Sequence, residues 1–544
     1  MRRATLSYDV VPGFRENKLL LDYLAQRSPA TRCLPPLLTG DEVLGPRVER
    51  LGSLSFPREV LADRLLSYNR DRGAGEKSLT AIEDFRRGAM VVVTGQQPGL
   101  LGGPLFTIYK ALSTCLLARH VEKKGHGRTI PLFWSASEDH DLREANRLDL
   151  FEGDKPERLA LDLEDRGSCL SDYEIDPLAP AFIDRVRDAL HHTEFTPELL
   201  ERMKTWLRGG FGDWFSRMMH SLFREFGLVI VEPRLIRDLA APFIEREIRE
   251  PEATAAAIRH AGAENQAAGY PPSLTGDEGP SLFVIRNGIR DRVLHRDGQF
   301  YLRRGGKIEK EKLLADLAED PGLFSQGVAI RPVVQDGLFP VVATVAGPSE
   351  ISYLAQLGEV YLQHGVDRPP ILPRVSVTLI EGKVERVLDR LALSPEQALV
   401  LEKNQEQILA SVPSEVDGFL DARVEIDECL ARMEKSLPTD LRGIFPRMER
   451  RIRRELDRVQ GKVEEEARRR QGIGEEQIAR VKNGIIPAGK LQERVWGIVP
   501  LLNRYGPNLI DEIAESAELF SFEHQWLYLA HQPQATAGAK PSGG

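Results

Sequence analysis

The chain has 544 residues, of which 42% are hydrophobic and 28% charged, so it can build two or more domains with buried cores. Its formal net charge of −9 argues against a nucleic-acid-binding protein, because such proteins usually present a basic surface. Four scattered cysteines without a C-x-x-C pair argue against a cysteine-built zinc site and a disulfide framework. No apolar run approaches the roughly 18 residues of a membrane span, so we expect a cytoplasmic protein without membrane contact.

The first predicted sheet element follows an N-terminal extension of short, proline-punctuated helices over residues 1–88. Residues 90–93 are a β-branched run that suits a strand buried on both faces. After a glycine-rich turn, apolar residues at helical spacing from Leu105 to Leu117 predict a helix that Pro104 would open. Strand, turn and helix would together offer backbone N–H groups to an anion such as phosphate. The alternative is a strand-to-helix turn that binds nothing.

A second buried strand is predicted at residues 130–134, and a charged cluster follows it. Open α/β sheets bind their ligands at the carboxyl ends of strands. Like charges gathered there are costly unless a cation or a proton offsets them. The alternative is a set of acidic residues that cap a helix N-terminus. The cluster consists of Glu138, Asp139, His140 and Asp141.

Two insertions are predicted between the elements of the main sheet. The first lies within residues 155–220 and combines polar loops with amphipathic stretches. A third buried strand follows at residues 228–231. The second insertion, residues 270–320, is expected to be rich in β-structure, because Asn287-Gly288 between two apolar runs is a hairpin signal.

Strand character returns at residues 328–334 and again at 341–345. One helix is then predicted to start near Pro348 and to continue through Tyr361. Alternating strands and helices of this kind are typical of a doubly wound, mostly parallel sheet. We therefore predict an α/β, Rossmann-like core for residues 1–380.

Residues 381–484 differ in composition, because glycine is sparse and charge is dense there. Narrow apolar stripes on either side of Pro438 predict an antiparallel, coiled-coil-like helical arm. We expect two copies of the chain to dimerise through these stripes; a hairpin packed only on itself is the alternative. Residues 485–535 are expected to return to the core, and residues 536–544 to form a disordered tail. The stripes comprise Phe419, Ile426, Leu430, Met433 and Leu437, and Phe445, Met448, Ile452, Leu456, Val459 and Val463.

Several motifs resemble those of the bacillithiol biosynthesis cysteine-adding enzymes, a family of cysteine ligases. The resemblance extends over nearly the whole chain, and the combination of motifs is specific. Some family members carry histidine where this chain has Tyr109. The matching segments are TGQQPGLLGGPLFTIYK (94–110), PLFWSASEDHD (131–141), the stretch from Arg331-Pro332 to Phe339-Pro340, VAGPSE (345–350), PILPR (370–374) and KLQERVW (490–496).

The resemblance implies that cysteine is joined through its carboxylate to the amine of glucosaminyl-malate, which gives bacillithiol. A carboxylate is a poor electrophile at neutral pH, so we expect activation by ATP as a co-substrate. Mg²⁺ could then bind Glu138, Asp139 or Asp141. Nucleotidyl transfer to another small acid is a second reading, and a nucleotide-binding scaffold whose arm recruits a partner is a third.

The nucleotide is expected at the glycine-rich turn. Lys110 and Tyr109 would contact phosphoryl oxygens as negative charge develops, in the place where nucleotidylyl-transfer folds carry a His-x-Gly-His segment. A solvated helix position is the alternative for Lys110. The remaining residues assigned to the turn are Thr94, Gly95, Gln96, Gln97 and Gly103.

The acceptor is expected at the charged cluster. His140 has the free pKa nearest to the working pH, so it is the predicted general base for the amine, oriented by Asp139 or Asp141. Mg²⁺ ligation and recognition of an ammonium group are the other roles open to the cluster. Arg331 and Arg374 are candidates for the malate carboxylates, because guanidinium binds carboxylate in a bidentate manner. A structural ion pair is the alternative for both arginines.

Overall fold

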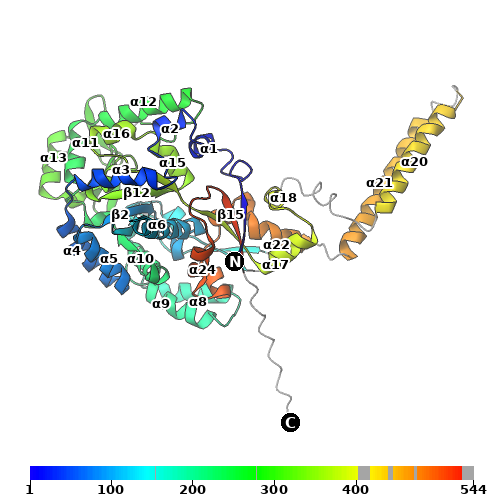
Figure 1. The fold of residues 1–544 in the computed structure, drawn as a ribbon, viewed down its shortest axis with the longest axis horizontal. Coiled ribbons are helices and arrows are strands. Elements are labelled where there is room, and N and C mark those ends of the chain that lie inside the picture. Colours follow the sequence, from blue (N-terminus) through cyan, green and yellow to red (C-terminus); the bar gives the residue numbers. More distant parts are fainter. Residues whose placement is uncertain (153–154, 277–278, 402–416, 439–444, 471–474, 530–544) are drawn as a thin grey trace, which may run out of the picture. The chain divides into compact units, whose positions relative to one another are not determined.

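The structure is a computed structural model, and Figure 1 shows its ribbon. The chain divides into two compact units: residues 1–379 with those from 490 onward, and residues 380–489. Among the described residues, no helix is long and apolar enough to cross a membrane. The structure describes residues 1–152, 155–276, 279–401, 417–438, 445–470 and 475–529, so the predicted tail at 536–544 lies outside them.

The core of the first unit is a sheet of five parallel strands in the order β13-β12-β2-β3-β6. This arrangement confirms the predicted Rossmann-like α/β fold. The chain winds from β2 through β3 to β6 on one side and places β12 and β13 on the other. The carboxyl ends of β2 and β12 therefore flank the point where the winding reverses, which is where such sheets bind ligands. The strands are β2 (Met90–Gln96), β3 (Thr129–Ser135), β6 (Val229–Val231), β12 (Val341–Ala346) and β13 (Ile371–Pro373).

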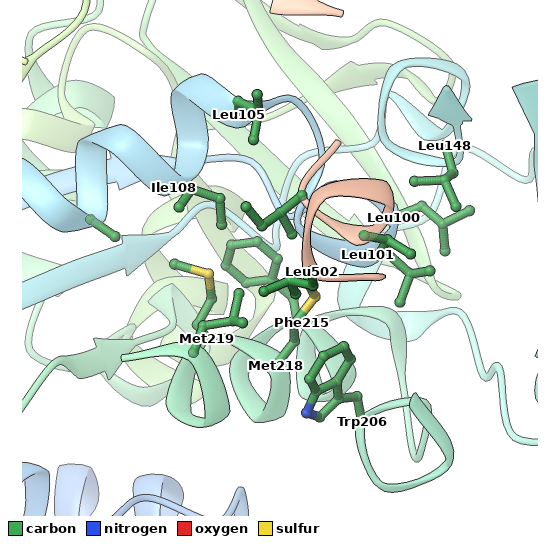
Figure 2. Close-up of a cluster of buried hydrophobic side chains, with 14 of the residues drawn as sticks. Leu100, Leu101, Leu105, Ile108, Leu148, Trp206, Phe215, Met218, Met219 and Leu502 are labelled. Atoms are coloured by element: carbon green, nitrogen blue, oxygen red, sulfur yellow. The ribbon is translucent and has the colours of Figure 1, made fainter. Parts of the chain in front are cut away.

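Helices cover both faces of this sheet. Alternate residues of β2 and β3 point to opposite faces, and one face packs on α4 (Arg58–Asp71) and α5 (Glu76–Arg86). The other face packs on α6 (Leu105–Lys123), the predicted helix after the glycine-rich turn. Figure 2 shows Leu105 and Ile108 of α6 in the same cluster as Phe215, Met218 and Met219 of α10 (Phe211–Leu222) and Leu502 of α23 (Val499–Tyr505).

Two local predictions are wrong. Residues 328–334 do not form a strand, because α14 (Arg331–Leu338) begins there with Pro332 in its first turn. The single helix predicted from Pro348 is two helices, α15 (Pro348–Leu354) and α16 (Gly358–Gln363). Between them, the buried Gln356 bonds the backbone of residues 273 and 274. The first error thus has a local cause, the helix start at Pro332, and the second has a tertiary one, the contacts of Gln356.

The second insertion forms an antiparallel sheet in the order β10-β9-β8-β7-β11. The predicted hairpin is present: β7 and β8 flank Asn287 and Gly288, whose φ values of 52° and 74° suit a tight hairpin turn. The strands are β7 (Leu282–Arg286), β8 (Ile289–Arg296), β9 (Gln299–Leu302), β10 (Gly306–Ile308) and β11 (Phe324–Gln326).

A third sheet joins the two ends of the chain. β1 (Arg2–Leu6) pairs antiparallel with β15 (His524–Tyr528), which neighbours β14 (Ser376–Ile380). The sequence predicted only helices in the first 88 residues, so β1 was missed, because its partner lies more than 500 residues away. His524 is fully buried, and its ring nitrogens lie 2.8 Å from Ser376 Oγ and 2.9 Å from Thr378 Oγ1.

Mild acid should weaken the first unit through His524. Burial lowers the pKa of this histidine to about 4, so the folded state resists protonation while the unfolded chain takes up a proton near pH 6.5. The contribution of His524 to the free energy of unfolding is then fully present above pH 6.5. It falls between pH 6.5 and 4, by about 2 kcal/mol at pH 5. Urea unfolding at pH 7 and pH 5 measures the loss. His524→Gln should show a flatter pH dependence, and an unchanged slope would contradict this role.

The second unit contains the helical arm. α20 (Asp417–Ser436) and α21 (Phe445–Arg470) are joined by ion pairs, including Arg453 to Asp427 at 2.5 Å. The unit also contains α17 (Gly382–Arg390), α18 (Pro395–Leu399) and α22 (Glu475–Ile485). Of the stripe residues with described side chains, Leu430 and Phe445 are buried. Much of the apolar stripe is exposed: Ile426 (38%), Met433 (52%), Met448 (56%), Ile452 (38%) and Val459 (42%).

Candidate active site

The loop after β3 holds the carboxylate of Glu138 inside the protein. Its Oε1 accepts a hydrogen bond from Arg237 Nε at 2.6 Å, and its Oε2 accepts one from Ser325 Oγ at 2.6 Å. Arg237 follows β6 and Ser325 lies in β11, so this carboxylate ties the main sheet to the inserted sheet. Because both of its oxygens have hydrogen-bond partners, the Glu138 side chain is held in one position at the side of the site.

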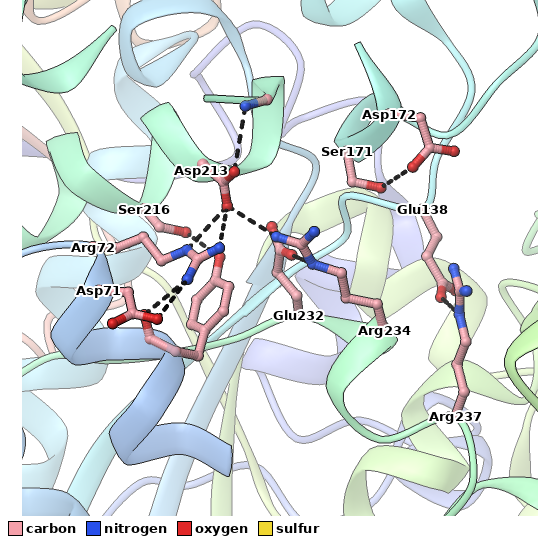
Figure 3. A network of polar contacts seen from close by, with 12 residues as sticks. Asp71, Arg72, Glu138, Ser171, Asp172, Asp213, Ser216, Glu232, Arg234 and Arg237 are labelled. Carbon is pink, nitrogen blue, oxygen red and sulfur yellow. Dashed lines mark hydrogen bonds and ion pairs between the residues drawn. The ribbon is translucent and has the colours of Figure 1, made fainter. Parts of the chain in front are cut away.

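The loop after β6 is anchored by the polar network in Figure 3. Glu232, at the end of β6, is fully buried and pairs with Arg234. Arg234 also donates to Asp213 of α10 at 2.9 Å, and Arg72, the residue directly after α4, donates to the same carboxylate at 2.7 Å. Burial raises the pKa of Glu232. The network fixes the loop that carries Arg237, and thereby fixes Glu138.

His140 is held by an arginine from the inserted sheet. Arg290 Nη1 of β8 lies 3.2 Å from His140 Nδ1. A guanidinium can only donate, so Nδ1 accepts and the neutral ring carries its proton on Nε2. Burial and the charge of Arg290 lower the pKa of His140. His140 is therefore neutral near pH 7, and it can act as a base only at Nδ1, once Arg290 has released that atom.

The two aspartates of the cluster have different surroundings. Asp139 lies beside His140 in the lining of a cleft between the end of β3 and the inserted sheet. Its Oδ1 accepts from the backbone N–H of His140 at 2.7 Å. Asp141 is exposed and caps the short helix α7 (Leu142–Ala145), because its Oδ1 accepts from the N–H of Glu144 at 3.0 Å. Asp141 therefore fits the alternative given for the cluster, that of an acidic residue capping a helix N-terminus.

The acidic cluster is not arranged as a ready-made cage of protein ligands for Mg²⁺ within the described residues. Within the described part of the chain, no group of three or more His, Cys, Asp or Glu side chains is placed to hold a metal ion. Glu138 and Asp141 also have other hydrogen-bond partners.

A second group of charges lies at the end of β2. Lys110 reaches back from α6, is 2% exposed, and contacts the Gly95 carbonyl, Gln96 Oε1 and the carboxylate of Glu350. Burial lowers its pKa, although the charge of Glu350 opposes this effect. The solvated alternative for Lys110 is therefore wrong. Because an ammonium group has three N–H donors, these contacts use all of them, and Lys110 acts here by holding the strand end.

Arg331 connects this strand end to the cleft. Its guanidinium donates to Gln335 Oε1 at 3.1 Å and to the Tyr353 hydroxyl at 3.0 Å, so both hydrogen-bond partners are neutral. A Cβ at Gly95 would lie 3.3 Å from Arg331 Nη1, so glycine allows this close approach. Arg331 lines both the cleft and a cavity of about 20 Å³ beside Thr94, which has room for about one water molecule.

Tyr109, Arg374 and Gly103 are among the predicted residues that do not line the cleft. Tyr109 is fully buried in the core. Arg374 is buried and forms a bidentate ion pair with Glu493, at 2.6 and 2.9 Å. It therefore fits the alternative of a structural ion pair. The N–H of Gly103 donates to the Leu100 carbonyl at 3.1 Å.

The helix that follows the glycine-rich turn is covered at its N-terminus. The N–H of Leu105 donates to the Trp496 carbonyl at 2.8 Å. Gln97 instead faces the other loop, and its Nε2 donates to the Asp141 carbonyl at 3.1 Å. The turn therefore uses these particular donors within the protein.

The cleft has a volume of about 280 Å³ and lies between the end of β3 and the inserted sheet. This volume approaches the lower end of that found for small-molecule sites. The sequence identified its residues Glu138, Asp139, His140 and Arg331. It missed the contributions of the inserted sheet, for which the only signal was the density of arginines between residues 286 and 304. The missed lining residues include Trp134, Phe283, Arg290, Arg292 and Gln326.

The fold and the cleft define a class: a Rossmann-like α/β protein with a polar small-molecule site at the carboxyl ends of its strands. Residues 6–375 match the family model described as the bacillithiol biosynthesis BshC N-terminal Rossmann-like domain. Residues 377–529 match the model described as the BshC C-terminal coiled-coil domain. The chain therefore belongs to the BshC family of bacillithiol biosynthesis, as the sequence motifs predicted.

Curated relatives are similar over most of their length and carry the name "Putative cysteine ligase BshC". The relative from Salinibacter ruber is 31% identical over 483 residues, which cover 86% of this chain and 88% of the relative. The relative from Koribacter versatilis is 32% identical, with 92% and 95% covered. The relative from Geobacillus thermodenitrificans is 29% identical, with 95% and 99% covered.

Proposed function

We propose that this protein joins L-cysteine to glucosaminyl-malate in bacillithiol synthesis, with an amide bond between the cysteine carboxylate and the glucosaminyl amine. The observation that carries the proposal is the cleft at the end of β3, in a chain whose relatives are named as cysteine ligases. The cleft combines a neutral imidazole and a carboxylate, which can handle an amine, with guanidinium groups, which can bind acids.

The cysteine carboxylate needs activation before an amine can attack it. We propose that ATP supplies this activation. A carboxylate oxygen of cysteine attacks a phosphorus atom of ATP and displaces either pyrophosphate or ADP, which gives a mixed anhydride. The acceptor amine then attacks the carbonyl carbon, and AMP or phosphate leaves. To Arg331, which Gln335 and Tyr353 hold at the end of β2, we assign the binding of an anionic group during these steps.

The amine must lose a proton when it attacks. We assign that proton to His140 Nδ1, with Asp139 beside it to bind the incoming ammonium group. Arg290 must leave Nδ1 for this transfer, because the guanidinium occupies that lone pair in the structure. Glu138 and Arg237 keep the wall of the site in place.

Incubation with ATP, cysteine and glucosaminyl-malate, followed by mass spectrometry, tests the proposal. The expected product is the mass of the two substrates joined with loss of one water, together with AMP or ADP. Omission of ATP is the control. A nucleotide product without the amide would support transfer to another acid instead. ATP binding without any turnover would support a nucleotide-binding scaffold.

We further propose that two copies of the chain dimerise through the arm. The support is the exposed apolar stripe on α20 and α21, because apolar surface of this kind is covered when a partner packs on it. In the full-length chain, Ile452→Glu with Val459→Glu should convert a dimer to a monomer in sedimentation analysis. Arg454→Glu, an exposed charge change on the same helix, is the matched control. A dimer that survives the double change, or that survives removal of residues 385–480, would refute the idea.

A further inference from the structure

The inserted sheet supplies the cleft with positive charge that the main sheet lacks. Between residues 282 and 312 the sequence has nine lysines and arginines and four acidic residues, in a chain whose net charge is −9. Two of these arginines, Arg290 and Arg292, line the cleft. They are two residues apart on β8, so their side chains lie on the same face of the strand.

Both arginines are held over one aromatic ring. The guanidinium carbon of Arg290 lies 3.6 Å from the centroid of Phe283, and that of Arg292 lies 5.7 Å from it. Phe283 is the cross-strand partner of Arg292 in the β7–β8 pair. The ring limits the positions of both guanidinium groups, so less conformational entropy is lost when they bind a ligand.

Within the described part of the chain, none of the hydrogen bonds of Arg290 goes to a carboxylate. Arg290 donates to Ser325 Oγ at 3.0 Å, to the Gln326 carbonyl at 2.9 Å and to His140 Nδ1. Glu138, a buried carboxylate in the lining of the cleft, is already bound by Arg237. The charge of Arg290 is therefore not neutralised by a hydrogen bond to either carboxylate oxygen of Glu138, and an anionic ligand would balance it.

Two buried donors in the lining point to the same kind of ligand. Trp134 Nε1 and Gln326 Nε2 have no hydrogen-bond partner among the described residues, although both side chains are at least nine-tenths buried. Buried N–H groups are almost always paired in folded proteins, because an unpaired one costs about 1–3 kcal/mol. A ligand rich in acceptor oxygens would satisfy them.

We propose that Arg290 and Arg292 of the inserted sheet bind the carboxylates of the malyl group and select the acceptor substrate. The assignment rests on the proposed function, and it gives the inserted sheet the recognition role that the buried Arg374 cannot fill. Arginine suits this task, because its fork binds carboxylate in a bidentate manner. When Arg290 turns to a substrate carboxylate, it also releases His140 Nδ1, so binding of the correct acceptor would free the base.

Calorimetric titration of the full-length protein tests the assignment, with glucosaminyl-malate and methyl glucosaminide as probes. The two share the amino sugar, and only the first carries carboxylates. Arg292→Gln should weaken glucosaminyl-malate binding roughly 10- to 100-fold, as expected for a charged hydrogen-bonded contact, and leave methyl glucosaminide binding unchanged. Arg292→Lys should keep part of the affinity. Arg296→Gln, an exposed change on the same strand, is the matched control and should bind as the wild type does.

Unchanged glucosaminyl-malate affinity in Arg292→Gln would overturn the proposal. An equal loss for both probes would also overturn it, because that result shows a structural effect on the site. Steady-state assays add a second readout: KM for the acceptor should rise while KM for cysteine stays constant. A wild type that discriminates between the probes but forms no amide would refute the proposed ligase activity and leave the carboxylate subsite standing.

Discussion

His140→Ala is expected to lower kcat/KM for amide formation by roughly 10²–10⁴-fold, the usual range for loss of a general base. The fold should persist, because the side chain lines the cleft and is 41% exposed. The assay is the ATP-dependent joining of cysteine to glucosaminyl-malate, with circular dichroism and thermal melting as checks of folding. His192→Ala, at an exposed position outside the cleft, is the control. Full activity in His140→Ala would remove this residue from the mechanism.

The pH profile gives that experiment a second readout. Burial, Arg290 and Arg304 lower the pKa of His140, while Asp139 and Asp141 oppose the shift. A base must be neutral, so activity should fall as the pH drops through this lowered pKa, and the acid limb should lie below pH 6.5. If the acid limb is lost in His140→Ala, the limb is assigned to the imidazole of His140. An acid limb above pH 6.5 in the wild type would contradict the assignment.

Arg374→Met is expected to destabilise the first unit by about 3–5 kcal/mol, the usual cost of leaving one member of a buried ion pair without its partner. Arg374 and Glu493 are both almost fully buried, and Glu493 also accepts from Ser376 Oγ at 3.0 Å and from the N–H of Val377 at 3.1 Å. The pair therefore holds the segment after residue 490 against β14. Urea unfolding of the full chain measures the effect.

A matched pair of variants separates burial from charge alone. Lys77→Met breaks an exposed pair with Glu225, where the side chains are 59% and 63% exposed, and should cost less than about 1 kcal/mol. Arg374→Met with Glu493→Gln should recover part of the loss, because no uncompensated buried charge then remains. An Arg374→Met variant no less stable than Lys77→Met would show that the buried pair does not hold the segment.

The sequence predicted those parts of the site in which charged residues directly follow an apolar strand. The buried runs of β2 and β3 are apolar and local, so the sequence indicated the parallel sheet and the edge at which Glu138, Asp139 and His140 lie. The same reasoning could not tell that Asp141 caps α7, because cap and ligand use the same residue type. It also could not tell that Lys110 is buried, because its partner Glu350 lies 240 residues away in the sequence.

The sequence by itself determined the class of fold, the helical arm and the family, because hydrophobic periodicity and long motifs are properties of neighbouring residues. Only the tertiary structure decided which arginine can meet a substrate. Arg374 and Arg290 look alike in the sequence, yet one is neutralised by Glu493 in the core and the other faces the cleft over Phe283. The physical reason is that a charge is free or compensated according to contacts between distant segments, and these contacts exist only after the chain has folded.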